Sequence, residues 1–447
     1  MKKNTLTNTF AAMLAIASAT GLHAQSDDVE FVPFNQFLKS TADINSTVMN
    51  RADSKVRERK NFEEMRRHVL SLYAGVEVSH SFVRDASTFD CVPVEQQPGL
   101  RMLGATSIAE QPPASMLSRP SGINGGGFGE GSFHGALATD GNARADRFGN
   151  STVCEANTIP MRRITLDEMV RFSSLREYFQ KGPDGAGQPM DPDTAKPASA
   201  SDGHKYAYML QHVNNIGGGS NLNLWNPVVD TNHGQVMSLS QEWYIGGSGT
   251  STQTAEVGWQ VMPRTWGTNY AVLFIYYTAD GYTKTGCYNL GCGAFVQVSK
   301  DVTLGASFPY YSTKGGDQYD FSAQYMLYKG NWWLAIDGEW IGYFKGSIYG
   351  NGQLTKNAQT IEFGSESVGS PVWPQEGSGE WATAGFGYAA YQRNMFYTDL
   401  SGNGYYAKLT AANPSPACYN TAGPYTDSSD DWQVFFYLGG PGGSTCQ

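Results

Sequence analysis

Carboxylates are the side chains best suited to chemistry in the second half of this 447-residue chain. None of the seven histidines follows His233, so a Ser–His–Asp or Cys–His catalyst would have few histidines to draw on there. The same shortage argues against a histidine-rich metal site, and we expect neither a metal nor a cofactor. Two carboxylates that share a site can hold one proton between them and act on water as base and acid.

Glu256 stands in the segment TAEVGWQV, residues 254–261. In a strand, Glu256, Gly258 and Gln260 would share one polar face, and the glycine would leave open space beside the carboxylate. The alternate residues, Trp259 among them, would face a core. This pattern is typical of a strand that lines a cleft.

Glu366 stands in the segment IEFGSESV, residues 361–368, where Glu362, Gly364 and Glu366 would share a face. Glycine again separates polar groups. Spacing alone does not bring Glu366 to Glu256, and Glu362 is a rival for the second carboxylate.

The elements around these glutamates read as short strands separated by Gly, Asn and Asp turns. About ten strands at this spacing predict an antiparallel β-sandwich of two packed sheets, or a closed sheet. The expected strands are residues 222–225, 237–244, 255–262, 271–278, 293–298, 319–328, 332–336, 384–391, 405–409 and 432–438.

The aromatic residues divide the chain near residue 200. All ten Trp lie between Trp225 and Trp432, and 23 of the 25 Tyr lie from Tyr206 onward. The aromatic-poor part is expected to be a smaller α+β unit with helices over residues 53–76 and 164–179. The first helix would bury Phe62, Met65, Val69, Leu72 and Val76, and the second would begin with a capping box of Thr165 and Glu168.

Residues 1–24 are typical of a secretory signal, with Lys2 and Lys3 before an apolar stretch and a small residue at the end. That stretch is too short to span a membrane. We therefore expect a secreted protein, extracellular or periplasmic, with no membrane partner. The net charge of −10 and the lack of a basic stripe argue against a nucleic-acid partner.

Export permits disulfides, and six cysteines allow 15 pairings. Pairs that respect the division of the chain are preferred: Cys91–Cys154, Cys287–Cys292 and Cys418–Cys446. Between the two parts, residues 181–203 contain four prolines and read as an exposed linker, the kind of segment that proteases cut.

Several separated motifs resemble the neprosin family of glutamic peptidases. They span roughly residues 85–180 and 204–446. The most specific are residues 255–261 and 285–297 with its two cysteines, and others are residues 224–227, 238–243, 280–282, 330–334, 341–343 and 436–442, with 90–92 and 158–163 in the first half.

The resemblance implies that Glu256 and Glu366 are catalytic. Glu256 matches the family's glutamate-x-Gly-Trp-Gln-Val motif. Glu366 matches the end of a Trp-Gly-Gly-Glu run, but this chain has Phe363-Gly364-Ser365-Glu366, and the Ser365 hydroxyl could lie near the second carboxylate. Oxyanion support from Gln241 and Gln260, and a cleft lined by Trp259 and Tyr288, are further expectations.

The resemblance further implies cleavage after proline at acidic pH. Residues 25–180 would then be a pro-domain that inhibits the catalytic domain, residues 204–447. Self-cleavage in the linker, most simply after Pro197, would activate it. A carbohydrate-active sandwich, either a glycosidase or a lectin-like module, is the alternative, because glycosidases also use two carboxylates and tryptophans stack on sugars.

Overall fold

The computed structural model describes residues 30–44, 46–102, 104, 107–117, 120, 145–182, 203–428 and 432–446. The expected signal segment and the expected cleavage site at Pro197 lie outside the described residues.

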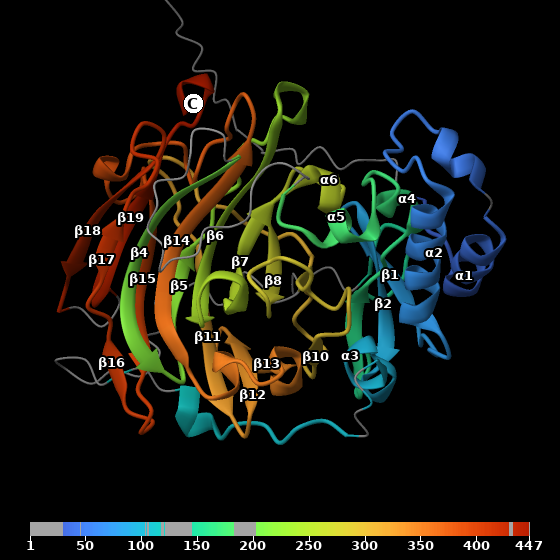
Figure 1. Ribbon diagram of the computed structural model, residues 1–447, viewed down its shortest axis with the longest axis horizontal. Helices are drawn as coiled ribbons and strands as arrows, with labels where there is room; N and C mark the ends of the chain where they lie inside the picture. Colours follow the sequence, from blue (N-terminus) through green and yellow to red (C-terminus); the bar gives the residue numbers. More distant parts are fainter. Residues whose placement is uncertain are drawn as a thin grey trace, which may run out of the picture.

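The residues from His204 onward form two antiparallel sheets that pack face to face (Figure 1). One has the strand order β17-β4-β14-β6-β7-β8-β9. Its strands are β4 (His204–Asn215), β6 (Gln235–Gly246), β7 (Gln253–Val261), β8 (Val272–Thr278), β9 (Cys287–Tyr288), β14 (Ala358–Gly369) and β17 (Thr410–Ala412).

The second sheet has the order β10-β13-β12-β11-β5-β15-β19-β18, with β16 also paired to β15. The predicted all-β sandwich is therefore confirmed. The strands of this nine-stranded sheet are β5 (Gly217–Asn223), β10 (Phe295–Gln297), β11 (Asp320–Tyr328), β12 (Asn331–Ile336), β13 (Glu339–Lys345), β15 (Ala390–Thr398), β16 (Gly404–Tyr406), β18 (Asn420–Thr426) and β19 (Val434–Gly439).

The core lies between the two sheets. Val257, Trp259 and Val261 are fully buried there, as the alternation in β7 predicts. The Trp259 indole N–H donates to the carbonyl of Asn223 in the facing sheet at 2.9 Å. The Tyr325 hydroxyl, on β11 of the same facing sheet, donates to the carbonyl of Glu256 at 3.1 Å and is a second tie between β7 and that sheet.

Some strand boundaries differ from the prediction. The segment expected at 384–391 begins only at Ala390, because Gly385 and Gly387 adopt left-handed backbone angles that break an extended chain. The strand expected at 405–409 ends at Tyr406. β4, β9, β13, β17 and β18 lie outside the expected strands, and β14 corresponds to the possible strand around Glu366.

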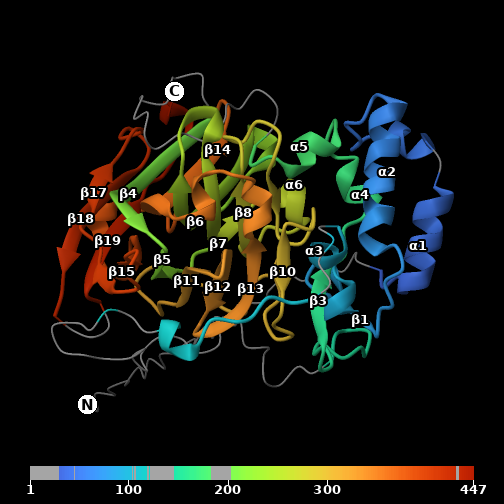
Figure 2. The same ribbon diagram turned by 60° about the horizontal axis from the view of Figure 1, so that its bottom comes forward.

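The N-terminal part is a mixed α+β unit beside the sandwich (Figures 1 and 2). Its elements are α1 (Phe34–Asp43), α2 (Arg59–Tyr73), β1 (Ser81–Arg84), β2 (Ser87–Pro93), α3 (Pro98–Arg101), β3 (Thr158–Arg162), α4 (Leu166–Met169) and α5 (Leu175–Phe179). The strand order is β1-β2-β3. All five residues of the predicted stripe are buried, but α2 covers only Arg59–Tyr73 of the expected 53–76, so Val76 is buried beyond the end of the helix.

The second predicted helix is instead two short ones. Thr165 caps α4 by accepting from the backbone N–H of Glu168, as expected. The Glu168 carboxylate turns to Arg162 and Tyr178 rather than back to the cap. α4 ends at Met169, and Ser174 caps the start of α5 by accepting from the N–H of Glu177.

Three disulfides join Cys91 to Cys154, Cys287 to Cys292 and Cys418 to Cys446. These are the pairs favoured by the division of the chain. Among the described residues, no helix has the length and apolar character needed to cross a membrane.

Candidate active site

The outer face of the seven-stranded sheet places Glu256 and Glu366 on either side of Gln241. Gly364 and Gly258 are the register partners of Gln241 on β14 and β7. Each glutamate lies two residues from its glycine, so both side chains project on the same face, diagonally across β6. A larger residue than glycine would clash at these positions: a Cβ atom on Gly258 would lie 2.6 Å from the Cβ of Gln241.

Both carboxylates converge on the ammonium of Lys181, which comes from the N-terminal part of the chain. Its Nζ lies 2.5 Å from Glu256 Oε2 and 3.1 Å from Glu366 Oε2, and it donates to Gln241 Oε1 at 3.0 Å. All three ionic side chains are shielded from solvent. The structure therefore brings the two predicted glutamates to a single point.

This contact sets the ionisation of the site. Burial opposes the charge on Lys181, but the two carboxylates raise its pKa above the usual value. Burial also opposes the charge on Glu366, yet the Lys181 ammonium and the His204 hydrogen bond lower its pKa to about 2. Lys181 thus holds Glu366 in the ionised form down to strongly acidic pH.

Each glutamate has one oxygen tied back and one oxygen facing Lys181. Glu256 Oε1 accepts from Thr254 Oγ1 at 2.6 Å and from the Tyr282 hydroxyl at 2.8 Å. Its Oε2 accepts from Gln241 Nε2 at 2.9 Å. Burial and the nearby Glu256 charge raise the Tyr282 pKa well above its usual value, so the phenol remains a neutral donor.

Glu366 is held in the same way from β4. Its Oε1 lies 2.6 Å from His204 Nδ1 and accepts from the Tyr206 hydroxyl at 3.4 Å. His204 is the first residue of β4, and Trp373 Nε1 fixes the preceding residue by donating to the Gly203 carbonyl at 2.8 Å.

Gln241 is part of the site, but Gln260 is turned to another group. Gln260 Nε2 donates to the Tyr288 hydroxyl at 3.1 Å, and its Oε1 accepts from Trp266 Nε1 at 3.0 Å. Tyr288 does lie on the glutamate side of the sheet, against Phe274, Tyr276 and Trp266. The expectation for Trp259 is corrected: it lies in the core between the sheets and cannot line this face.

The structure separates Glu362 and Ser365 from the pair. Glu362 is in register with Trp243, which stands between it and Glu256. The Ser365 hydroxyl points to the opposite face, where it bonds Glu376 and the carbonyl of Ala207. Ser365 therefore adds no oxygen beside Glu366, contrary to the expectation, because neighbouring strand residues face opposite ways.

Lys181 is delivered by a chain segment packed on β8 and β9. The Tyr276 hydroxyl donates to the carbonyl of Phe179 at 2.9 Å, and Arg176 Nη1 donates to the carbonyl of Thr285 at 3.2 Å. Arg264 pairs with Glu177 at 3.0 Å. Residue 181 is thus buried and is not the start of an exposed linker, and of the expected linker, residues 181–203, the stretch 183–202 lies outside the described part of the chain. We call Lys181 and the segment that carries it the plug.

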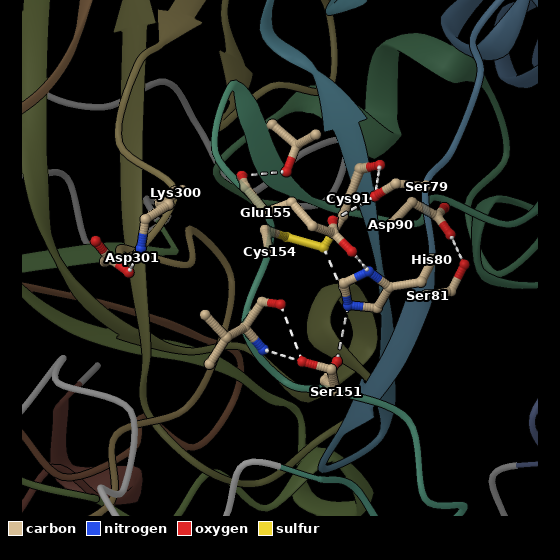
Figure 3. Close-up of a disulfide and its surroundings, with 12 residues drawn as sticks. Ser79, His80, Ser81, Asp90, Cys91, Ser151, Cys154, Glu155, Lys300 and Asp301 are labelled. Carbon is tan, nitrogen blue, oxygen red and sulfur yellow. Dashed lines mark hydrogen bonds and ion pairs between the residues drawn. A yellow bond between two sulfur atoms is a disulfide. The ribbon is translucent and has the colours of Figure 1, made fainter.

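Within the part of the chain that the structure describes, the side chains that could group around a metal lie elsewhere, at the Cys91–Cys154 disulfide (Figure 3). His80, Cys91 and Glu155 approach one another there, but the Cys91 sulfur is bonded to Cys154. His80 Nδ1 lies 3.0 Å from Glu155 Oε1 and its Nε2 lies 2.9 Å from the carbonyl of Ser151. These contacts tie β1 and β2 to the loop before β3 and serve the fold of this unit.

Residues 234–441 match the family model Neprosin, which includes both glutamates and Gln241. This segment is therefore a neprosin domain, as the motifs predicted. Lys181 and His204 lie outside the matched residues. Among solved structures, sheep galectin-11 in complex with glycerol aligns over 37% of this chain and 92% of its own, at 11% identity and a TM-score of 0.18. A score this low carries no structural argument.

Proposed function

We propose that this chain, which carries a neprosin domain, is the latent form of a secreted peptidase in which Glu256 and Glu366 activate water. The observation that carries the proposal is the meeting of both carboxylates at Lys181 Nζ. The family match supports a peptidase-like role. The glutamic mechanism, the preference for proline and the latency are the parts that we add.

Water replaces the ammonium when the Lys181 segment leaves. The two Oε2 atoms that now face Lys181 would then face one water molecule between them. The ionised glutamate takes a proton from that water as its oxygen attacks the peptide carbonyl, and the protonated glutamate donates to the leaving nitrogen. No covalent intermediate forms.

We assign Glu366 as the base and Glu256 as the acid. Glu366 keeps the His204 hydrogen bond after Lys181 departs, and this contact lowers the Glu366 pKa and so favours the ionised carboxylate. The donors on Glu256, from Thr254, Tyr282 and Gln241, are neutral. Gln241 Nε2 lies between the two glutamates and can turn to the developing oxyanion.

Cleavage after proline fits the walls of the site. The Lys181 ammonium lies 5.5 Å from the ring centre of Tyr276, 5.7 Å from that of Trp243 and 5.9 Å from that of Phe274. Once the lysine leaves, these flat apolar rings flank the carboxylates. A proline ring buries apolar surface against such walls without losing a backbone N–H bond, since proline has none.

Latency follows from the same contact. Residues 25–180 act as an intramolecular inhibitor, and α5 at the end of this part places the following Lys181 on the catalytic pair. Residues 183–202 contain four prolines, so the enzyme carries its own substrate beside the plug. We propose that acid frees the plug, that self-cleavage in this segment, most simply after Pro197, follows, and that residues 204–447 are the active enzyme.

Purified protein is incubated at about pH 4 and at about pH 7 with either a proline-containing peptide or a polysaccharide, and hydrolysis is measured. The N-terminus of the protein after each incubation is then sequenced. We expect peptide cleavage after proline at pH 4 and a new start within residues 184–203. Polysaccharide cleavage without peptidolysis would favour the carbohydrate-active alternative. A start far from that window, or no shift after acid, would contradict the proposed activation.

A further inference from the structure

A second surface of the sandwich is covered by the N-terminal part of the chain, far from the glutamates. We call residues 107–117 (SIAEQPPASML) the strap. In Figure 2 the strap, in cyan, passes β13, β12 and β11 on the outer side of the nine-stranded sheet. It includes the short 3₁₀ helix η3 (Ala114–Leu117).

The surface beneath the strap is aromatic, and we call it the aromatic face: Met326, Trp333, Trp340 and Tyr343. Trp333 is the register partner of Met326 on β11 and of Tyr343 on β13. The ring centres of Trp333 and Tyr343 are 4.6 Å apart. These residues are at most 4% exposed, and Ala109, Met116 and Leu117 of the strap pack against them.

The polar contacts between strap and face go mainly to the strap's backbone. The Ala109 N–H donates to the Tyr343 hydroxyl at 2.9 Å, and Gln324 Nε2 donates to the carbonyl of Met116 at 2.6 Å. Glu110 adds a surface anchor to Lys329 at 2.5 Å. Backbone contacts do not depend on side-chain identity, so any extended peptide of suitable shape can make them.

The face also holds hydrogen-bonding atoms that the strap does not use. The indole N–H groups of Trp333 and Trp340 and the Oε1 of Gln324 are buried and have no hydrogen-bond partner among the described residues. A buried donor without a partner is unfavourable, and a bound chain that offered an acceptor would relieve that cost. The two indoles can donate to carbonyls, which polyproline-type chains leave free of internal hydrogen bonds.

The strap itself indicates the ligand. It contains Pro112 and Pro113 in an extended stretch, and Pro112 is buried. From the aromatic rings, the backbone contacts and the free indole donors, we infer that the aromatic face is a second binding site for extended proline-containing peptides. The strap occupies it in the latent chain. Its role toward substrate rests on the proposed function: release of the N-terminal part would open the site for a proline-rich substrate chain.

The test uses the full-length chain and a fluorescent peptide with the sequence of residues 107–117. A triple variant, Glu110→Ala, Pro112→Gly and Met116→Ala, weakens the binding of the strap to the aromatic face without removing the strap from the chain. Fluorescence anisotropy should show at least tenfold tighter peptide binding to this variant than to the wild type, because the strap no longer competes. Adding Glu256→Gln should leave the binding unchanged, so that failure of the peptidase proposal and failure of this one can be distinguished.

Two changes locate the site. In the weakened chain, Tyr343→Phe keeps the ring and removes the hydroxyl, and should weaken binding roughly fivefold through the lost hydrogen bond. A peptide with both prolines replaced by alanine should bind at least tenfold more weakly. Hydrogen exchange should show protection of β12 and β13 on binding. Equal binding to wild type and weakened chain, no binding at all, or binding of a polysaccharide in place of the peptide would overturn the inference.

Discussion

Replacing Lys181 by methionine is the most informative change, since it removes the ammonium and keeps the apolar length of the side chain. The processed enzyme would not contain residue 181, so its own activity should be that of the wild type. The substitution acts only on the latent chain, where the plug and the catalytic pair meet.

The size of the expected effect on docking follows from the pKa of Glu366. The pKa of this buried carboxyl falls from 4.5 to about 2 when Lys181 and His204 contact it. Each pKa unit corresponds to about 1.4 kcal/mol, so the net shift, in which the contacts outweigh the effect of burial, corresponds to about 3 kcal/mol in favour of ionised Glu366. Lys181 and His204 share this preference, and only the Lys181 part is lost in the variant. We therefore expect the ratio of docked to open chains to fall by roughly 10- to 100-fold.

The sign of the pH effect follows from the lowered pKa. A carboxylate whose pKa is lowered on docking stabilises the docked state fully above about pH 4.5, and this stabilisation is lost as the pH falls toward 2. Wild-type chain should therefore stay unprocessed at neutral pH and process itself increasingly below about pH 4.5.

The assay follows the appearance of the processed band on a gel, and peptide hydrolysis, across a pH series. Lys181→Met should process itself at higher pH and faster at each pH than the wild type. Lys205→Met is the matched control, because Lys205 is also buried but packs on Trp373, away from the pair. The reasoning would be refuted if the Lys181→Met chain stayed as latent as the wild type and began to process itself at the same pH.

Three further predictions concern the processed enzyme. His204→Asn removes a contact that lowers the Glu366 pKa, so the acid limb of the kcat/KM profile, where activity is lost as Glu366 is protonated, should move to higher pH; an unchanged limb would argue against Glu366 as base. Tyr282→Phe removes a hydrogen bond to Glu256 and should lower kcat/KM about tenfold without lowering Tm; wild-type kinetics would argue against this role. Gly258→Ala places a Cβ within 2.0 Å of the Ser240 carbonyl oxygen and should cost about 1–3 kcal/mol of stability in thermal unfolding; an unchanged Tm would show that the strand can shift without penalty.

The fold and the face on which each glutamate lies could be predicted from the chain because both depend on local patterns, whereas the pairing of Glu256 with Glu366 followed from the resemblance to the neprosin family. Period-two alternation in β7 places Glu256 on one face and Trp259 on the other, and the structure has them so. The same period places Ser365 on the face opposite Glu366, and Trp259 on the face opposite Glu256, so neither side chain lies in the cleft. Neighbours in the sequence of a strand are not neighbours on its faces.

Lys181 and His204 could not be predicted in the same way. Lys181 is a single lysine before a proline- and glycine-rich stretch, and no spacing marks it. Its place depends on the docking of α5 onto β8 and β9, which rests on contacts between residues about 100 positions apart in sequence. The scarcity of histidines directed attention to carboxylates and away from His204, the histidine whose Nδ1 contacts Glu366.

The most direct test of the central claim is peptide hydrolysis at about pH 4 by Glu256→Gln and Glu366→Gln, with Glu362→Gln as the matched control on the same face. To separate catalysis from activation, a trace of wild-type enzyme processes each variant before it is purified. We predict that each of the first two substitutions lowers kcat at least 1000-fold with Tm preserved, in the upper range of an essential acid or base, and that Glu362→Gln retains most activity. Peptidolysis that survives both catalytic substitutions would contradict the account.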